Sequence, residues 1–166
     1  MKIKRAWAMP NHKTFDIKPI REWIGEVPII SVDPFARNCD LAGLTNDINF
    51  ECTATYNKDA LTFLNGISDG FAECVLYDPP YSLRQLKECY DGIGKAMTQR
   101  ESQHFFSDVK NEIARITQVG GTVLSFGWNT VGMGKSRGFE IQDILLVCHG
   151  GMHNDTICVR EIKNGN

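Results

Sequence analysis

The chain has 166 residues, of which 42% are hydrophobic and 23% charged, as in soluble globular proteins. This length fits a single domain, 1–166, and leaves no room for a second one. With 18 basic and 20 acidic side chains, the net charge of −2 excludes an overall positive field that attracts nucleic acid or anionic lipid. The sequence contains neither an apolar run long enough for a membrane span nor a signal-peptide core, which predicts a cytoplasmic protein without membrane partners.

Helices and strands alternate through the first half of the chain. Helices are indicated by apolar residues three and four positions apart, and buried strands by continuous runs of β-branched and other apolar residues. The predicted elements are a helix over 16–24, a buried strand over 27–32, a weaker strand over 44–48, a short helix over 59–64 and a buried strand over 73–77.

The second half begins with two predicted helices and ends with strands. Ser82 and Gln85 form a capping box that begins the first helix, and Gly120-Gly121 is predicted to end the second. The remaining elements are a strand over 122–126, a glycine-rich loop over 127–138, and two strands over 140–148 and 156–162.

This order of elements predicts an α/β fold. Strands that alternate with helices form a mostly parallel sheet with helices on both faces, and two successive strands at the end add one antiparallel strand, expected at the C-terminal edge. In such sheets ligands bind outside the carboxyl ends of the strands. Asp33, Asp47, Asp78 and Phe126 lie at those ends, so a site is expected there.

The segment Asp78-Pro79-Pro80-Tyr81 lies directly after a buried strand and before a capped helix. In this context it resembles motif IV of the S-adenosylmethionine-dependent DNA amino-methyltransferases, which methylate N6 of adenine or N4 of cytosine. The resemblance implies a Rossmann-like methyltransferase fold with S-adenosylmethionine as cofactor. Across the chain it is similar to the small adenine-specific enzymes encoded by phages and prophages.

The chemistry explains why these residue types belong together. An exocyclic amino group is a poor nucleophile because its lone pair is delocalised into the ring. The Asp78 carboxylate and the Pro79 carbonyl would accept its hydrogen bonds and stabilise the charge that develops on nitrogen. Pro79 and Pro80 restrict φ and hold that carbonyl in place. Tyr81 would stack on a base that has left the duplex.

Other segments match the family in its expected order. The motif around Phe15, Lys18 and Pro19 is similar to the segment that holds the methionine part of the cofactor. Asp33-Pro34-Phe35 resembles the start of motif I, although Arg37-Asn38-Cys39 follows where most members have glycines. The resemblance therefore implies these cofactor-binding residues: Phe15, Lys18, Pro19, Asp33, Pro34, Phe35, Asp47 on the ribose, Asp59 beside the adenine, and Asp78.

DNA is the expected partner, double- or single-stranded. The family's separate target-recognition domain does not fit in a chain of this length, so we expect short or relaxed sequence specificity. Contacts to DNA are predicted in the glycine-rich loop, from Trp128, Asn129, Lys135 and Arg137. A homodimer is left open as one way for a short chain to hold DNA.

The leading hypothesis is a DNA N6-adenine methyltransferase. The alternatives are an N4-cytosine or RNA adenine methyltransferase, and an inactive module that binds cofactor or nucleic acid. Cys148, His149, His153 and Cys158 match no standard zinc spacing, so no metal is expected. The six cysteines include no Cys-x-x-Cys pair and are expected to be reduced thiols.

Overall fold

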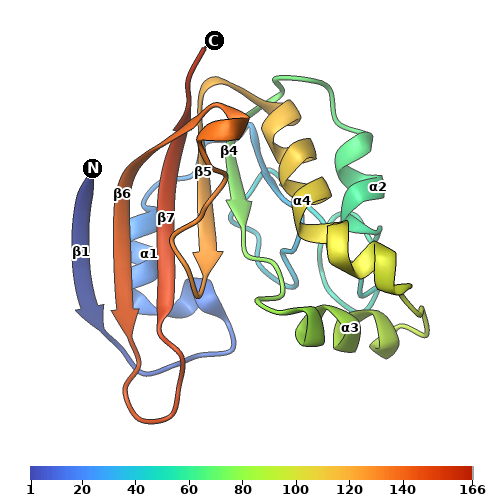
Figure 1. Cartoon of the computed structure of the whole chain (residues 1–166), viewed down its shortest axis with the longest axis horizontal. Coiled ribbons are helices and arrows are strands. Elements are labelled where there is room, and N and C mark those ends of the chain that lie inside the picture. Colours follow the sequence, from blue (N-terminus) through green and yellow to red (C-terminus); the bar gives the residue numbers. More distant parts are fainter. Residues whose placement is uncertain (166) are drawn as a thin grey trace.

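A computed structural model describes residues 1–165 of the chain (Figure 1). Within them seven strands form one sheet, in the order β1-β6-β7-β5-β4-β2-β3. Strand β7 is antiparallel to both of its neighbours, and the other pairings along the sheet are parallel. The predicted fold class is confirmed, but the antiparallel strand lies between β5 and β6, not at an edge of the sheet.

The strands match most of the prediction. Their bounds are β1 Lys2–Trp7, β2 Ser31–Asp33, β3 Leu44–Thr45, β4 Ala72–Tyr77, β5 Thr117–Gly127, β6 Phe139–Cys148 and β7 Thr156–Lys163. The apolar run at 27–32 supplies only the short strand β2. Strand β1 was not predicted because nearly all of its side chains are exposed, so burial left no pattern in its sequence.

Three of the helices begin at a capping side chain. Their bounds are η1 Thr14–Asp16, α1 Lys18–Ile24, α2 Ala60–Asn65, α3 Leu83–Gly92, α4 Gln99–Ile116 and η2 Lys135–Arg137. Asp59, Ser82 and Thr98 cap α2, α3 and α4 with their side chains. No helix in residues 1–165 is long and apolar enough to cross a bilayer.

The prediction that Gly120-Gly121 ends a helix is wrong. Helix α4 ends at Ile116, and both glycines lie inside β5. Gly120 has a φ of +81°, and a Cβ on Gly121 would lie 3.0 Å from the carbonyl oxygen of Ala72 on β4. Gly121 therefore serves a close approach of two strands, and Gly120 supplies a positive φ within the strand.

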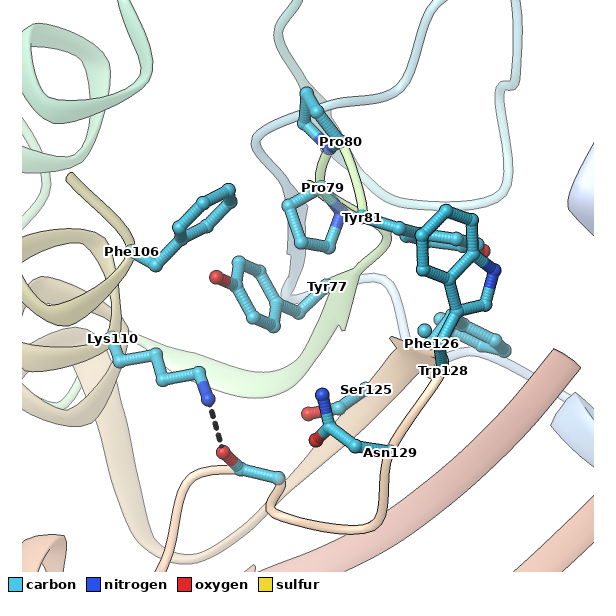
Figure 2. A pocket seen from close by; sticks show the side chains of 12 residues that line it. Tyr77, Pro79, Pro80, Tyr81, Phe106, Lys110, Ser125, Phe126, Trp128 and Asn129 are labelled. Atoms are coloured by element: carbon cyan, nitrogen blue, oxygen red, sulfur yellow. Dashed lines mark hydrogen bonds between the residues drawn. The ribbon is translucent and has the colours of Figure 1, made fainter. Parts of the chain in front are cut away.

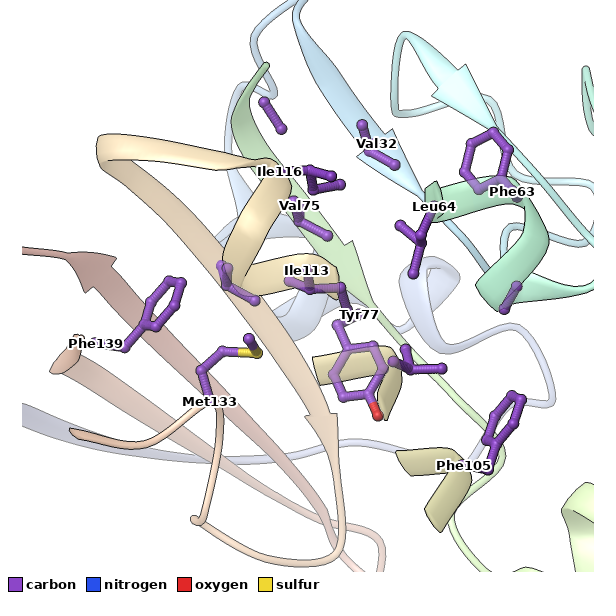
Figure 3. Packing of buried hydrophobic residues seen from close by; sticks show 14 of the residues in the cluster. Val32, Phe63, Leu64, Val75, Tyr77, Phe105, Ile113, Ile116, Met133 and Phe139 are labelled. Carbon is purple, nitrogen blue, oxygen red and sulfur yellow. The ribbon is translucent and has the colours of Figure 1, made fainter. Parts of the chain in front are cut away.

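Two apolar layers cover the sheet, because neighbouring residues of a strand point to opposite faces. Val32, Val75 and Val123 face α2, α3 and α4 in one layer. Figure 3 shows Ile113 and Ile116 of α4 in that layer. On the other face Leu76, Leu124 and Val147 pack against η1 and α1. This arrangement confirms helices on both faces of the sheet.

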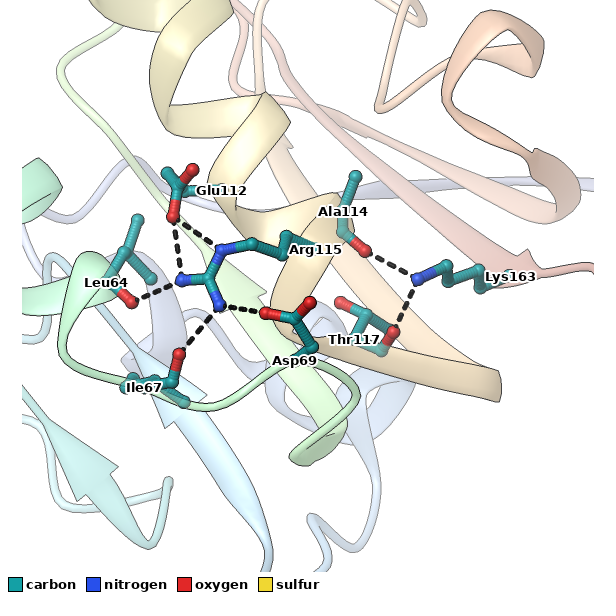
Figure 4. A network of polar contacts seen from close by, with 8 residues as sticks. All are labelled: Leu64, Ile67, Asp69, Glu112, Ala114, Arg115, Thr117 and Lys163. Carbon is teal, nitrogen blue, oxygen red and sulfur yellow. Dashed lines mark hydrogen bonds and ion pairs between the residues drawn. The ribbon is translucent and has the colours of Figure 1, made fainter.

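A polar network fixes the end of α4 at the amino ends of β4 and β5 (Figure 4). Arg115 donates to the carboxylate of Asp69 at 2.6 Å and to the Leu64 carbonyl at 2.9 Å. Lys163 donates to the carbonyls of Ala114 and Thr117, two acceptors that the helix end leaves without helical partners. These contacts are structural and lie opposite the edge where the strands end.

Candidate active site

Strands β2, β4 and β5 end side by side at the carboxyl edge of the sheet. The register pairs Val32 with Val75 and Tyr77 with Ser125, so the residues that follow these strands meet at one place. Asp33 ends β2 and Asp78 follows β4 directly. The charge of Asp78 is close enough to raise the pKa of Asp33.

Asp78 is held by its own loop and by the segment before α1. Its carboxylate accepts a hydrogen bond from the Tyr81 hydroxyl at 2.6 Å. The Thr14 hydroxyl of η1 is a second partner of the same carboxylate. The backbone N–H of Tyr81 donates to the Gln85 side chain at 2.7 Å, while Ser82 caps α3. The four residues Asp78 to Tyr81 therefore form a fixed turn between strand and helix.

A cavity of about 240 Å³ opens beside this turn (Figure 2). Its lining combines the Pro-Pro-Tyr segment with the start of the glycine-rich loop. The lining residues are Tyr77, Pro79, Pro80, Tyr81, Phe106, Lys110, Ser125, Phe126, Gly127, Trp128, Asn129 and Gly132. The Tyr81 and Trp128 rings meet edge to face, with centroids 5.5 Å apart. Such aromatic and proline walls suit a flat ring system.

The polar groups of the cavity lie on its floor. The Ser125 hydroxyl is buried and has no hydrogen-bond partner within the described residues. The Asn129 side-chain oxygen accepts a hydrogen bond from the N–H of Val131, so the amide NH2 group of the side chain points toward the cavity in Figure 2. Lys110 of α4 donates to the Gly132 carbonyl at 2.6 Å. A ligand here would find hydrogen-bonding groups below and apolar walls around it.

The loop after β2 is fixed by buried polar contacts. Asn46, fully buried, donates to the carbonyls of Pro34 and Lys58. Asp47 accepts from the N–H of Arg37 at 3.0 Å. Asp33 accepts from the N–H of Phe35 at 3.0 Å through one oxygen, and its other oxygen is buried without a partner among residues 1–165.

These carboxylates make the edge strongly acidic. Burial raises the pKa of Asp33 well above its usual value, and the charges of Asp78 and Asp47 raise it further. The N–H of Phe35 opposes this change. Burial also raises the pKa of Asp78, against the hydrogen bonds from Tyr81 and Thr14. A positively charged ligand would relieve this repulsion and is the kind that the edge favours.

Several predicted residues are exposed or are engaged with other parts of the protein. The Lys18 side chain is 86% exposed beside Glu22. Asp59 caps α2 with one carboxylate oxygen and accepts from the Tyr90 hydroxyl with the other. Phe15 is buried against Phe126, with ring centroids 4.9 Å apart. These positions give Asp59 and Phe15 roles in the fold itself.

The glycine-rich loop does not act as one surface. Trp128 and Asn129 line the cavity, but Lys135 and Arg137 form η2 at the amino ends of the strands, the upper side in Figure 1. Arg137 donates to the carbonyl of Met133 and to the side chain of Asn111. Its guanidinium therefore fastens the loop to α4.

No protein-family model matches the sequence, and no curated protein matches it. Solved structures do share its architecture. TrmN from Thermus thermophilus has a TM-score of 0.58 at 14% identity, over 88% of this chain and 47% of its own. PH0851 has a TM-score of 0.55 at 12% identity, over 86% of this chain and 44% of its own. The chain thus spans less than half the length of either structure.

A third structure is matched over most of both chains. The protein yhhF from Escherichia coli, assigned to the methyltransferases, has a TM-score of 0.55 at 10% identity, over 94% of this chain and 89% of its own. The fold is the Rossmann-like methyltransferase fold. In this methyltransferase fold the chain places Asp33, Asp47 and Asp78 at the carboxyl edge, as the sequence predicts.

Sequence reasoning missed several residues around the cavity. Ser125 and Tyr77 lie within strands read only as core, and Lys110 and Phe106 lie on a helix read only for its buried face. Thr14 belongs to a segment that the sequence singled out, but its contact with Asp78 depends on the chain crossing between distant elements. No local pattern marks these residues, because their neighbours are set by the sheet order.

Proposed function

We propose that the chain is an S-adenosylmethionine-dependent methyltransferase that acts on the N6 amino group of adenine in DNA. The observation that carries the proposal is the position of Asp78. Its carboxylate lies at the carboxyl edge of a methyltransferase fold, next to a cavity walled by Pro79, Pro80, Tyr81 and Trp128. An aromatic slot beside a carboxylate and a proline carbonyl is what methylation of an amino group on a flat base requires.

S-adenosylmethionine is the expected cofactor of this fold, and the residues present fit it. The unpartnered oxygen of Asp33 is a buried acceptor that nothing in the described chain satisfies. The acidic edge formed by Asp33, Asp47 and Asp78 suits a molecule with a sulfonium and an ammonium group. When bound, the cofactor supplies an electrophilic methyl group.

The chain's own residues would prepare the acceptor. A flipped adenine would enter the cavity beside the touching rings of Tyr81 and Trp128, with its amino group toward Asp78. The carboxylate and the Pro79 carbonyl would accept hydrogen bonds from the two N–H groups, which frees the nitrogen lone pair to attack the methyl group. The Asp78 carboxylate would then take the proton that the methylated nitrogen loses. The Tyr81 hydroxyl now occupies a lone pair of Asp78 and would yield it to the substrate.

The same site chemistry accommodates the neighbouring substrates. Cytosine N4 is also an exocyclic amino group, and adenine in RNA presents the same ring and the same N6. The proposal includes a short or relaxed target sequence. The substrate is therefore to be identified by the modified nucleoside itself.

The test is nucleoside mass spectrometry on unmethylated plasmid and on total RNA, each incubated with the chain and S-adenosylmethionine. We expect N6-methyladenine in DNA from the wild type, and a loss of about 100-fold or more from Asp78→Ala. Asp91→Ala, which removes an exposed carboxylate from α3, is the matched control and should retain full turnover.

The other possible results bear either on the substrate or on the role of Asp78. Methylated cytosine or methylated RNA would replace the proposed substrate and leave the role of Asp78 in place. Turnover retained in Asp78→Ala would contradict the proposed chemistry. Thermal unfolding of both variants would show that lost turnover does not come from lost folding.

A further inference from the structure

Most backbone N–H groups of the loop after β2 are hydrogen-bonded to acceptors within the protein. A glycine-rich loop at this position would point free N–H groups at an anionic part of a ligand. Here four of those N–H groups have internal acceptors: Phe35 donates to Asp33, Ala36 to the Asn46 carbonyl, Arg37 to Asp47, and Cys39 to the Ala36 carbonyl. An anionic group at this loop therefore needs a side chain as its partner.

Arg37 occupies the conformation that a glycine would take. Its φ is +53°, and it is the one non-glycine residue with a positive φ within residues 1–165. Such backbone strain concentrates at sites that bind ligands, where the surrounding contacts maintain it. Two contacts do so here: the N–H of Arg37 donates to Asp47, and its guanidinium donates to the His12 carbonyl at 3.0 Å.

The guanidinium bridges the two segments between which the methionine part of the cofactor would lie. His12 precedes η1, and Arg37 lies in the turn after β2, so the bridge crosses the carboxyl edge. Its remaining N–H groups have no acceptor among the described residues, and the residue is exposed. Its charge also lowers the pKa of Asp78, which places both groups on one side of the site.

The charges around this edge support the same position for the carboxylate of the ligand. An amino-acid carboxylate entering this edge would be repelled by Asp33, Asp47 and Asp78 unless a cation met it. Lys18, the cation that the sequence assigns to this part of the ligand, points into solvent. Arg37 is a cation whose charge acts on Asp78 and whose backbone N–H donates to Asp47.

We propose that the Arg37 guanidinium binds the α-carboxylate of S-adenosylmethionine, in place of the backbone N–H groups of a glycine-rich loop. The inference rests on the proposed function for the identity of the cofactor. It makes Arg37 a binding residue whose contribution depends on one group of the ligand, the carboxylate. A planar guanidinium suits this group because it can donate two parallel hydrogen bonds.

The test is isothermal titration calorimetry on the full chain with two ligands, S-adenosylmethionine and decarboxylated S-adenosylmethionine. The two compounds share the sulfonium, the amine and the adenosine and differ in the carboxylate. We expect Arg37→Gln to weaken S-adenosylmethionine binding by about 10- to 100-fold, as for a lost charge-assisted hydrogen bond. Binding of the decarboxylated compound should change by less than about 2-fold.

Two further variants distinguish the effect of the guanidinium on binding from the effects of backbone conformation and of net charge. Arg37→Gly retains the positive φ without strain, so it should fold at least as stably as the wild type and show the same selective loss. Arg84→Gln removes an exposed guanidinium that pairs with Glu88 on α3, and both ligands should bind it as they bind the wild type.

The outcomes distinguish a failure of the proposed role of Arg37 from a failure of the proposed function. Equal weakening of both ligands by Arg37→Gln, or no weakening of either, would overturn the role of Arg37 and leave the cofactor in place. A wild type that binds neither compound would overturn the proposed cofactor, and the inference with it.

Discussion

Asp33 is the residue at which stability and binding oppose each other. Its folded pKa is raised above that of an unfolded chain, so the folded state holds the extra proton between the two pKa values. Stability must therefore fall as pH rises through that interval. Ionisation of this buried carboxylate, which has one oxygen unpartnered, therefore costs the ligand-free protein free energy.

We expect Asp33→Asn to raise the Tm of the ligand-free protein at pH 8 by roughly 3 °C or more, because each unit of pKa shift is worth about 1.4 kcal/mol. The gain should shrink near pH 4, where the wild-type carboxyl is protonated. Thermal unfolding at both pH values checks this, with the exposed Asp108→Asn as control. A lower Tm at pH 8 would show that the carboxylate is stabilising, contrary to the argument.

Ser125 is a second residue whose substitution should affect activity and stability differently. Its buried hydroxyl has no partner within the described chain, so deleting it removes no hydrogen bond from the fold. We expect Ser125→Ala to change the free energy of unfolding by less than about 0.5 kcal/mol and to lower kcat/KM for the acceptor about 10-fold. Steady-state kinetics and urea unfolding measure the two effects, and Ser136→Ala in η2 is the exposed control. Unchanged kcat/KM would remove Ser125 from acceptor recognition.

At the scale of elements, the glycine-rich loop forms one wall of the cavity and is held in place by side chains of β7, α4 and η2. The fully buried carboxylate of Glu161 on β7 accepts from the N–H groups of Met133 at 2.6 Å and Gly134 at 3.1 Å. Lys110 and Arg137 fasten the same loop to α4. The cavity therefore keeps its shape partly through Glu161 and Arg137, which do not line it.

We expect Glu161→Gln to lower the free energy of unfolding by about 1 to 3 kcal/mol, because the two N–H groups bond to different carboxylate oxygens and the amide replaces one of these acceptors with a donor. The loosened loop should also raise the KM for the acceptor more than it lowers kcat. Urea unfolding and kinetics check this beside Glu140→Gln, an exposed glutamate on β6. Equal stability of the two variants would mean that the loop is held without Glu161.

The elements also show how far the sequence could predict this molecule. Periodicity and capping found α2, α3 and α4, and buried apolar runs found β4 and β6, since these elements bury one side against the sheet. Strand β1 and the true course of β5 were missed, because exposure and strand contact leave no local signal. In the site, Asp78 was found from its motif, whereas Arg37 gained meaning only from its φ and its bond to His12.

For the whole molecule, charge is distributed unevenly despite the net value of −2. Residues 1–21 contain six basic residues and one acid, so the rest of the chain is strongly acidic. This basic segment includes β1 and runs past the carboxyl end of β6 to η1, where Thr14 contacts Asp78. A nucleic acid that enters the cavity would meet this segment, whereas η2 lies at the far end of the sheet.

Two exposed lysines test which end of the molecule contacts nucleic acid. We expect Lys13→Gln, next to Thr14, to weaken oligonucleotide binding and to reduce the salt slope of log K by about 0.9 for duplex or about 0.7 for a single strand, since one phosphate contact is lost. Lys135→Gln, at η2, should leave both quantities unchanged. Fluorescence anisotropy over a range of salt concentrations measures them. If Lys135→Gln instead carries the loss, the glycine-rich loop contacts nucleic acid as its sequence suggests, and the strand must reach around the sheet from the cavity to its amino ends.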